Sequence, residues 1–347
     1  MTTQSTTPTA PTMRASVLTR PGTVEVQDVP VPTLTDNQVL VRISAVGVCG
    51  SDTHFFHEGH IGDMVVKEPL ILGHESAGRI VAIGADVSPD RIGERVSIEP
   101  QKPCRVCEYC KGGQYNLCPD IEFYAAPPIH GAFAEFAAID SDFAYPVPDH
   151  VSDAAAALIE PLSVAIATCR KAAVQPGSRV LIAGAGPIGI LVAKVAGIYG
   201  AADITVSDPA PHRREFVLGA GATRAVDPRS DDLAGAGTLF DVFVDASGAP
   251  AAIQAGIRAV KPGGKVVLVG MGADTVELPV SLIQNREIEL TGIFRYTNTW
   301  PMAIDLVASG LVDLDALITH RFGLEDVKTA LLTGGQDPHA IKSIIVP

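Results

Sequence analysis

Aromatic and basic residues are both scarce in this chain of 347 residues. Phe, Trp and Tyr make up 5% of it, and 26 Lys and Arg stand against 39 Asp and Glu, so the formal net charge is −13. Nucleic acids and anionic membranes attract basic surfaces, and this charge balance therefore argues against both as partners. The composition predicts an acidic, soluble protein.

Long apolar runs are missing as well. No window approaches the roughly 18 apolar residues of a membrane span. The N-terminus, "MTTQSTTPTAPTM", lacks the basic start and the apolar segment of a signal peptide. Its Thr and Pro content predicts a disordered tail over residues 1–12. By default we expect a cytoplasmic location.

Apolar residues as a whole are plentiful, at 47%, and the length suits about two domains. Residues 13–160 alternate short β-branched runs with Gly, Pro and Asp, which predicts a β-rich, partly closed barrel. Residues 161–296 alternate apolar strands with helical stretches, which predicts a parallel sheet with helices on both faces. Residues 297–347 end in a helix and a strand that we expect to rejoin the first domain. The predicted fold class is α/β.

A glycine-rich turn, "GAGPIG", follows the apolar strand "RVLIA" and opens a helix. It places Gly184, Gly186 and Gly189 in the spacing that binds a dinucleotide, where the backbone approaches the pyrophosphate and the helix N-terminus stabilises its charge. Asp208 lies about twenty residues further on, where an acid can accept hydrogen bonds from the ribose hydroxyls. The alternative is a plain glycine turn with Asp208 as a turn residue.

The same acid bears on the choice between NAD and NADP. Asp208 would repel a 2′-phosphate, whereas Arg213 and Arg214 nearby could receive one. We expect the acid at the strand end to dominate, and the predicted cofactor is NAD.

Four of the six cysteines fall between residues 104 and 118, spaced C-x2-C-x2-C-x7-C. Four thiolates complete the coordination of tetrahedral zinc, so this loop predicts a structural site; an iron–sulfur cluster or four free thiols are the alternatives. The residues of the site are Cys104, Cys107, Cys110 and Cys118.

A second metal set is spread along the chain in "GVCGSD", "GHE" and "LIEPLSV". Cys49, His74 and Glu75, with Glu160 available, would leave zinc an open position for substrate, as catalytic sites do. Glu160 stands in an otherwise apolar run, where an unpaired charge costs several kcal/mol. A carboxylate facing the metal, directly or through its water, accounts for it; a helix-capping acid facing solvent is the alternative.

These motifs together resemble the zinc-dependent medium-chain alcohol dehydrogenases. "ALIEPLSVAIATCR", "GIFRYTNTWP" and "THRFGLE" resemble the polyol branch, with sorbitol and xylitol dehydrogenases. The resemblance covers nearly everything after residue 13. It implies a GroES-like catalytic domain, a Rossmann domain, two zinc ions per chain and a homotetramer.

The resemblance also assigns roles to single residues. It implies Cys49, His74 and Glu75 as zinc ligands and Glu160 as a second acid that binds zinc or holds its water. The implied cofactor contacts, besides the glycine turn, are Ile188, Asp208, Arg213, Val269, Gly270, Met271, Phe294 and Arg295. Arg295 and Tyr296 would also reach substrate. Phe55 stands where relatives carry a substrate-contacting Tyr, which puts the fine substrate preference in doubt.

The predicted activity is the reversible oxidation of a secondary alcohol of a polyol to a ketose, with NAD as acceptor. Ser51 and His54, close to Cys49, are candidates for carrying the proton outward, although a surface position for His54 is nearly as plausible. The rival enzyme is a related dehydrogenase acting on simple secondary alcohols, a sugar or an amino alcohol. The rival from another class is a non-catalytic NAD-binding protein that holds only the structural zinc.

Overall fold

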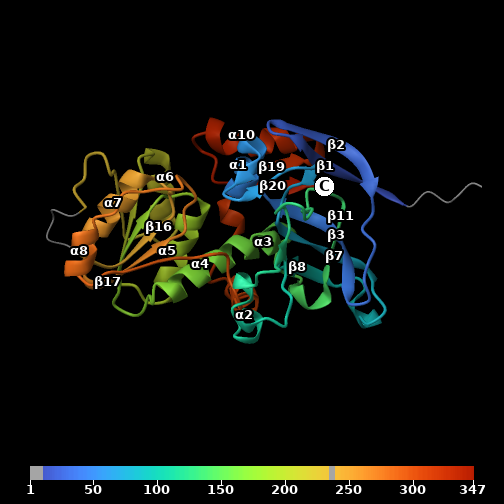
Figure 1. The fold of residues 1–347 in the computed structure, drawn as a ribbon, viewed down its shortest axis with the longest axis horizontal. Helices are drawn as coiled ribbons and strands as arrows, with labels where there is room; N and C mark the ends of the chain where they lie inside the picture. Colours follow the sequence, from blue (N-terminus) through green and yellow to red (C-terminus); the bar gives the residue numbers. More distant parts are fainter. Residues whose placement is uncertain (1–10, 234–238) are drawn as a thin grey trace, which may run out of the picture.

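The structure is a computed structural model that describes residues 11–233 and 239–347. A β-rich half and a half of sheet and helices lie side by side, with the helices α3 (Asp153–Ala157) and α4 (Ile159–Lys171) between them (Figure 1). Most of the predicted tail, residues 1–10, lies outside the described residues. Strand β1 begins at Thr12, which the sequence had assigned to that tail.

The β-rich half is built around a seven-stranded sheet in the order β12-β8-β7-β3-β20-β19, with β11 also paired to β3. Its strands are β3 (Gln38–Gly47), β7 (Glu75–Ile83), β8 (Arg95–Ile98), β11 (Phe136–Asp140), β12 (Ala144–Pro146), β19 (Ile318–Gly323) and β20 (Lys342–Val346). Strand β20, from the end of the chain, pairs antiparallel with β3. The C-terminal segment thus completes the first sheet.

This half also contains three smaller sheets. One holds β1 (Thr12–Arg20) between β2 (Thr23–Pro30) and β6 (Leu70–Ile71), and the other two consist of two short strands each. These two-stranded sheets pair β4 (His60–Ile61) with β5 (Met64–Val65), and β9 (Gln101–Lys102) with β10 (Glu122–Phe123).

The other half contains a six-stranded sheet in which every pairing is parallel. Its order is β15 (Arg224–Val226), β14 (Asp203–Ser207), β13 (Arg179–Ala183), β16 (Phe240–Asp245), β17 (Val260–Leu268) and β18 (Glu289–Gly292). This is the order of the doubly wound dinucleotide-binding fold, whose ligand lies beyond the carboxyl ends of the strands. The predicted parallel sheet is confirmed.

Both faces of this sheet are buried, because successive side chains of a strand point to opposite faces. On β13, Val180 and Ile182 pack in one cluster with α4 and α5, whereas Leu181 packs on the other face with α7. The remaining helices are α1 (Gly50–Glu58), α2 (Glu108–Lys111), α5 (Pro187–Ile198), α6 (Pro211–Gly219), α7 (Pro250–Ala259), α8 (Val280–Asn285), α9 (Trp300–Ala308) and α10 (Val327–Gln336). No helix within the described residues is long and apolar enough to cross a membrane.

Helix α4 follows α3 after an interruption of one residue. Helix α3 ends at Ala157, Leu158 interrupts, and α4 then begins at Ile159, which puts Glu160 and Pro161 in its first turn. Pro161 has no N–H to donate to the carbonyl of Ala157, so a continuous helix would lose a bond at this point. The break brings Glu160 into the buried space between the two halves.

Candidate active site

Three residues of the second predicted metal set meet at the end of β3 and the start of β7, two central strands of the β-rich sheet. Strand β3 ends at Gly47, which is paired with Glu75, the first residue of β7. Cys49 follows two residues after Gly47, and His74 directly precedes Glu75. One ligand atom from each of Cys49, His74 and Glu75 lies within 4.8 Å of the others. A Cβ at Gly47 would come 1.9 Å from the Glu75 carboxylate, so glycine leaves the room that this acid occupies.

His74 is oriented by a second acid, Asp52. The Asp52 carboxylate is fully buried, accepts hydrogen bonds from the N–H groups of Cys49 and Gly73 (both 2.9 Å), and lies 3.5 Å from His74 Nδ1. Burial acts to lower the pKa of His74, but the negative charges of Asp52 and Cys49 outweigh it and raise this pKa well above its usual value. The position therefore favours a cation, and carboxylates of this kind commonly orient a metal-bound His.

Glu75 has a partner from the other end of the chain. The Nζ of Lys342, the first residue of β20, lies 2.6 Å from the Glu75 carboxylate and donates to the carbonyl of Val48 at 2.8 Å. Burial acts to lower the pKa of Lys342, but the charges of Glu75 and Cys49 raise it, so the ammonium stays charged. One acid of the site is thus held by a fixed counter-charge.

Glu160 is buried close to this set but is not grouped with its three donor atoms. Its Oε1 accepts a hydrogen bond of 2.8 Å from the hydroxyl of Tyr296. Burial raises the pKa of Glu160 to about 7, against the opposing charge of His74 and with the help of the like charge of Glu75. Burial and the Glu160 charge also raise the pKa of Tyr296, whose hydroxyl therefore remains a donor.

Arg295 lies in the same region, where its guanidinium group packs on the ring of Phe123. Its guanidinium carbon lies 3.6 Å from the centre of the Phe123 ring, and the centre of that ring is 5.5 Å from the His74 ring. Burial lowers the pKa of Arg295 to about 10. Its Nη1 is buried and has no partner among the described residues. An unpaired buried donor of this kind is suited to a substrate hydroxyl.

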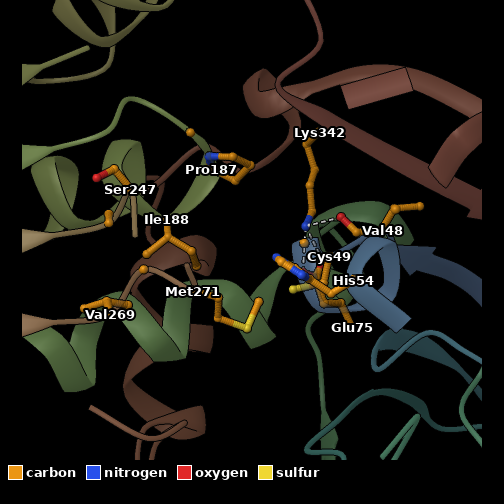
Figure 2. A pocket seen from close by; sticks show the side chains of 14 residues that line it. Val48, Cys49, His54, Glu75, Pro187, Ile188, Ser247, Val269, Met271 and Lys342 are labelled. Carbon is orange, nitrogen blue, oxygen red and sulfur yellow. Dashed lines mark hydrogen bonds and ion pairs between the residues drawn. The ribbon is translucent and has the colours of Figure 1, made fainter. Parts of the chain in front are cut away.

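A cavity of about 230 Å³ lies between the metal set and the nucleotide-binding sheet. Cys49, His54, Glu75 and Lys342 line one side, and residues of the glycine turn and of the ends of β16 and β17 line the other (Figure 2). Those on the second side are Gly186, Pro187, Ile188, Ala246, Ser247, Val269, Gly270 and Met271. The cavity therefore connects the carboxyl ends of the parallel strands with Cys49 and Glu75.

The glycine turn fits a dinucleotide. Gly184 has a positive φ of 97°, and a Cβ at Gly189 would lie 1.9 Å from the Gly184 carbonyl, so side chains are excluded from both. Nothing lies within 4 Å of a Cβ built on Gly186, which leaves its backbone open to a phosphate. Asp208 accepts hydrogen bonds from the N–H groups of Ala185 and Ala210, both at 2.8 Å. A carboxylate has about four acceptor positions, so two remain for ribose hydroxyls.

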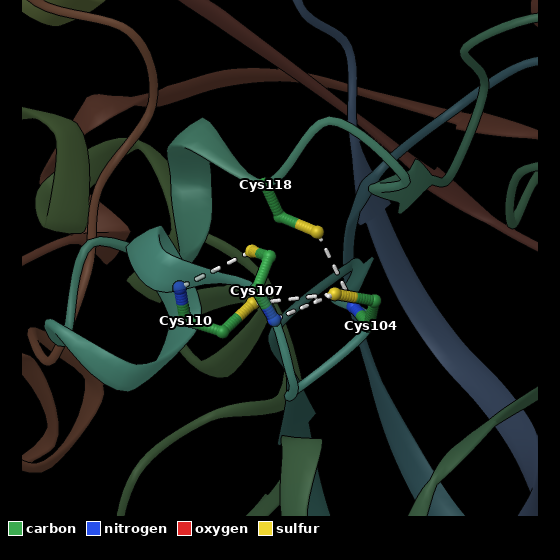
Figure 3. Close-up of side chains that lie close together, drawn as sticks. All are labelled: Cys104, Cys107, Cys110 and Cys118. Atoms are coloured by element: carbon green, nitrogen blue, oxygen red, sulfur yellow. Dashed lines mark hydrogen bonds between the residues drawn. The ribbon is translucent and has the colours of Figure 1, made fainter.

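The four clustered cysteines converge from one loop around α2. All four sulfur atoms lie within 4.8 Å of one another, and Cys104 and Cys110 Sγ are 4.0 Å apart (Figure 3). Tetrahedral Zn–S bonds of about 2.3 Å require sulfur separations of about 3.8 Å. The N–H groups of Val106 and Cys107 lower the pKa of Cys104 to about 7, whereas burial raises the pKa of Cys110 to about 12 and also raises that of Cys118. The donors and their spacing fit zinc.

Several predicted site residues lie elsewhere. Phe55 is 4% exposed and packs in the core of the β-rich half, because Asp52, Phe55 and Phe56 share the inner face of α1; the structure does not bring it to the cavity. Ser51 does not line the cavity, whereas His54 does. Phe294 is half-exposed and lines a separate cavity beside the cysteine loop. Arg213 is half-buried on α6, and its neighbour Arg214 forms an ion pair with Asp227.

Asp52 and Lys342 were not predicted from the sequence motifs. Asp52 belongs to the same "CGSD" stretch as Cys49, and the usual pairing of a metal-bound His with a carboxylate could have drawn attention to it. Nothing in the sequence around Lys342 connects it with Glu75.

Comparisons with known proteins agree with this arrangement. Residues 35–149 match the family model of the alcohol dehydrogenase GroES-like domain, and residues 187–309 match that of the zinc-binding dehydrogenases. The sorbitol dehydrogenase of Bacillus subtilis (strain 168) is 41% identical over 326 residues, 92% of each chain. L-idonate 5-dehydrogenase from Escherichia coli has a TM-score of 0.89 at 31% identity, covering 97% of this chain and 98% of that one.

A third relative bears on the cofactor. A short chain alcohol dehydrogenase from Escherichia coli CFT073, solved in complex with cofactor NADH, has a TM-score of 0.91 at 27% identity and covers 97% of this chain and 99% of its own. The chain therefore belongs to the zinc-binding, medium-chain alcohol dehydrogenases. Within that family it falls in the polyol branch, with the sorbitol dehydrogenases. The predicted family, the GroES-like and Rossmann fold class and the oxidoreductase class are confirmed.

Proposed function

We propose that the protein catalyses the reversible, NAD-dependent oxidation of a secondary alcohol of a polyol to a ketose, at a zinc ion held by Cys49, His74 and Glu75. The observation that carries the proposal is the convergence of these three donors beside a cavity that Cys49 and Glu75 line on one side and the glycine turn lines on the other. Zinc, when bound, acts as a Lewis acid on the substrate hydroxyl, and NAD accepts the hydride. The second zinc of the chain is assigned to Cys104, Cys107, Cys110 and Cys118.

The residues around the site hold the substrate and move its proton. The Tyr296 hydroxyl donates a 2.8 Å hydrogen bond to Glu160 and so fixes the position of this carboxylate beside the proposed metal ligands. There Glu160 can bind a water molecule or a second hydroxyl group of the substrate. Arg295 offers its unpaired Nη1 to the hydroxyl groups that a polyol has and a simple alcohol lacks. His54 lines the cavity with a side chain that is 38% exposed, so it can pass a proton to solvent. His54 Nδ1 lies 3.8 Å from a carboxylate oxygen of Glu58, one turn further along α1.

The cofactor is assigned to the turn at Gly184, Gly186 and Gly189, with Ile188, Val269, Gly270 and Met271 beside the nicotinamide end. Asp208 at the end of β14 favours NAD over NADP, since a 2′-phosphate would meet a buried carboxylate. Arg213 is assigned to the same ribose. The homotetramer and the cofactor contacts of Phe294 and Arg295 are proposed on the resemblance alone. The cytoplasmic location is proposed by default, from the composition and the N-terminal sequence.

A substrate panel tests the assignment. Sorbitol, xylitol and 2-butanol are compared as substrates by the absorbance of reduced nicotinamide, with NAD and NADP side by side. We expect kcat/KM to be higher for the polyols and with NAD. Arg295→Ala should lower kcat/KM for xylitol by about tenfold or more, the effect of one buried charged hydrogen bond, and change that for 2-butanol little. Equal use of xylitol and 2-butanol, unaffected by this change, would contradict the proposal.

A further inference from the structure

The segment 293–300 follows β18 and carries both Arg295 and Tyr296. Arg295 and Asn298 have positive φ angles of 57° and 53°, in the left-handed region where a residue with a side chain is strained. Such a conformation persists only when surrounding contacts hold it. The segment belongs to the nucleotide-binding half, but the contacts that hold it come largely from the other half.

One set of these contacts comes from a row of polar side chains. Ser97, Glu99 and Gln101 alternate along the extended stretch 95–102 and are all fully buried. Ser97 Oγ accepts a 3.0 Å hydrogen bond from the indole N–H of Trp300. Gln101 Nε2 donates to the carbonyl of Tyr296 at 3.2 Å and to Glu99 at 2.7 Å. The row thus forms hydrogen bonds with the segment at Tyr296 and at Trp300, four residues apart.

The second set comes from the four-cysteine lobe, residues 104–118. The Tyr115 hydroxyl donates to Glu99 at 2.9 Å and accepts from the N–H of Asn298 at 2.8 Å. The Asn116 amide donates to the carbonyl of Phe294 at 2.7 Å. The Asn298 side chain donates to the carbonyl of Gly113 at 3.1 Å. The lobe therefore holds the segment at Phe294 and at Asn298.

Glu99 is the point where the two sets meet. Its Oε1 accepts from both Gln101 and Tyr115, and the side chain of Tyr145 is a further polar neighbour of this carboxylate. A buried carboxylate is unfavourable for stability, and burial raises the pKa of Glu99 to about 7. Packing does not explain why an acid occupies this position. The need for a hydrogen-bond acceptor between the polar row and the four-cysteine lobe does explain it.

We propose that Glu99 is a positioning residue, which joins the polar row and the four-cysteine lobe into one clamp and so holds Arg295 and Tyr296 in place for the substrate. The zinc-holding lobe thereby serves substrate binding as well as stability. The part of this inference that concerns substrate rests on the proposed function; the part that concerns the clamp does not. A displacement of a binding group by about 1 Å costs up to about a hundredfold in rate, so a loosened clamp should be measurable.

The test compares Glu99→Leu, which removes the acceptor, with Glu99→Gln, which keeps an amide oxygen at that position. Hydrogen exchange of the peptide covering 293–300 reports on the Asn298 N–H. The emission of Trp300, the only tryptophan in the chain, reports on the end of the segment. Lys102→Gln is the matched control, since Lys102 lies on the same stretch but makes a surface pair with Glu122. Zinc per chain is measured for every variant.

For Glu99→Leu we expect faster exchange at Asn298, red-shifted Trp300 emission and a KM for xylitol raised about tenfold, the effect of losing about 1.4 kcal/mol of positioning, with kcat less affected. Glu99→Gln and Lys102→Gln should behave like the wild type, and zinc content should not change. Unchanged exchange, emission and KM in Glu99→Leu would overturn the inference.

A milder variant covers the case in which Glu99→Leu does not fold. Asn116→Ala removes a single bond between lobe and segment, and it should speed exchange at 293–300 by a smaller factor; no change would overturn the clamp. If the wild type oxidises no polyol, the proposed function fails, while exchange and emission still decide whether the clamp exists.

Discussion

The ammonium of Lys342 lies 2.6 Å from the carboxylate of Glu75, although 267 residues separate them in the sequence. Lys342 begins the strand that joins the end of the chain to β3, and Glu75 begins the strand on the other side of β3. The pair therefore depends on the C-terminal segment returning to the first domain. It sets the charge of the proposed metal site, since Lys342 balances one of its acids.

Lys342→Met should destabilise the zinc-free protein more than the zinc-bound protein. Without Lys342, Glu75 becomes a buried charge with no counter-charge, which costs about 3–5 kcal/mol in the free energy of unfolding. Bound zinc restores part of the missing positive charge, so the loss should be smaller in its presence. Urea unfolding with zinc and with a chelator measures both. Lys265→Met, which breaks the surface pair with Glu289, is the control at about 0–1 kcal/mol; equal effects of the two changes would argue against this role.

Cys110→Ser should lower the zinc content by about one ion per chain and leave the second ion in place, because four thiolates form one closed site. Elemental analysis after dialysis gives the count. Cys169→Ala is the matched control: Cys169 is fully buried in α4, outside both metal sets, and the change should leave the zinc content as it is. Loss of both ions in Cys110→Ser, or of neither, would contradict the assignment of two separate sites.

Asp208→Ser should reduce the preference for NAD. The change removes the acid that is assigned to the ribose hydroxyls and lifts the repulsion of a 2′-phosphate, so the ratio of kcat/KM for NAD and NADP should fall about tenfold or more. Asp208 also holds the N–H groups of Ala185 and Ala210, and some stability should be lost with it. Initial rates with both cofactors give the ratio. A ratio that stays at the wild-type value would show that Asp208 does not select the cofactor.

Glu99 should make the folded protein less stable as pH rises from about 4.5 to about 7. In that window the unfolded chain has released the proton of this carboxyl, whereas the folded chain, with a pKa of about 7, retains it. Unfolding then releases a proton, so higher pH favours unfolding, by up to about 3 kcal/mol. Glu99→Gln lacks this group and should gain stability relative to wild type across the window. Urea unfolding at pH 5 and pH 8 tests it, and a constant difference between the two proteins would refute the prediction.

The sequence predicts best where chemistry requires a fixed local spacing. The cysteine loop and "GAGPIG" are each defined within fifteen residues, and their geometry follows from local backbone structure. The apolar strands of the parallel sheet were predictable for a similar reason, because burial on both faces leaves continuous apolar runs such as "RVLIA".

Contacts between distant segments were beyond such reasoning. The ion pair of Lys342 with Glu75 depends on how two strands pair with β3, and the row at Ser97, Glu99 and Gln101 gains its meaning only beside the segment at 293–300. Phe55 is a different case. The resemblance implied a place beside substrate for this residue, whereas the helical period turns its ring into the core.

Anomalous diffraction at the zinc edge, on crystals grown with zinc and NAD, tests the central claim most directly. The account predicts two peaks per chain, one within the four cysteines and one bonded to Cys49, His74 and Glu75 at about 2.0–2.3 Å, beside the bound nicotinamide. A single peak, within the four cysteines, and no ion between Cys49 and His74 would contradict it.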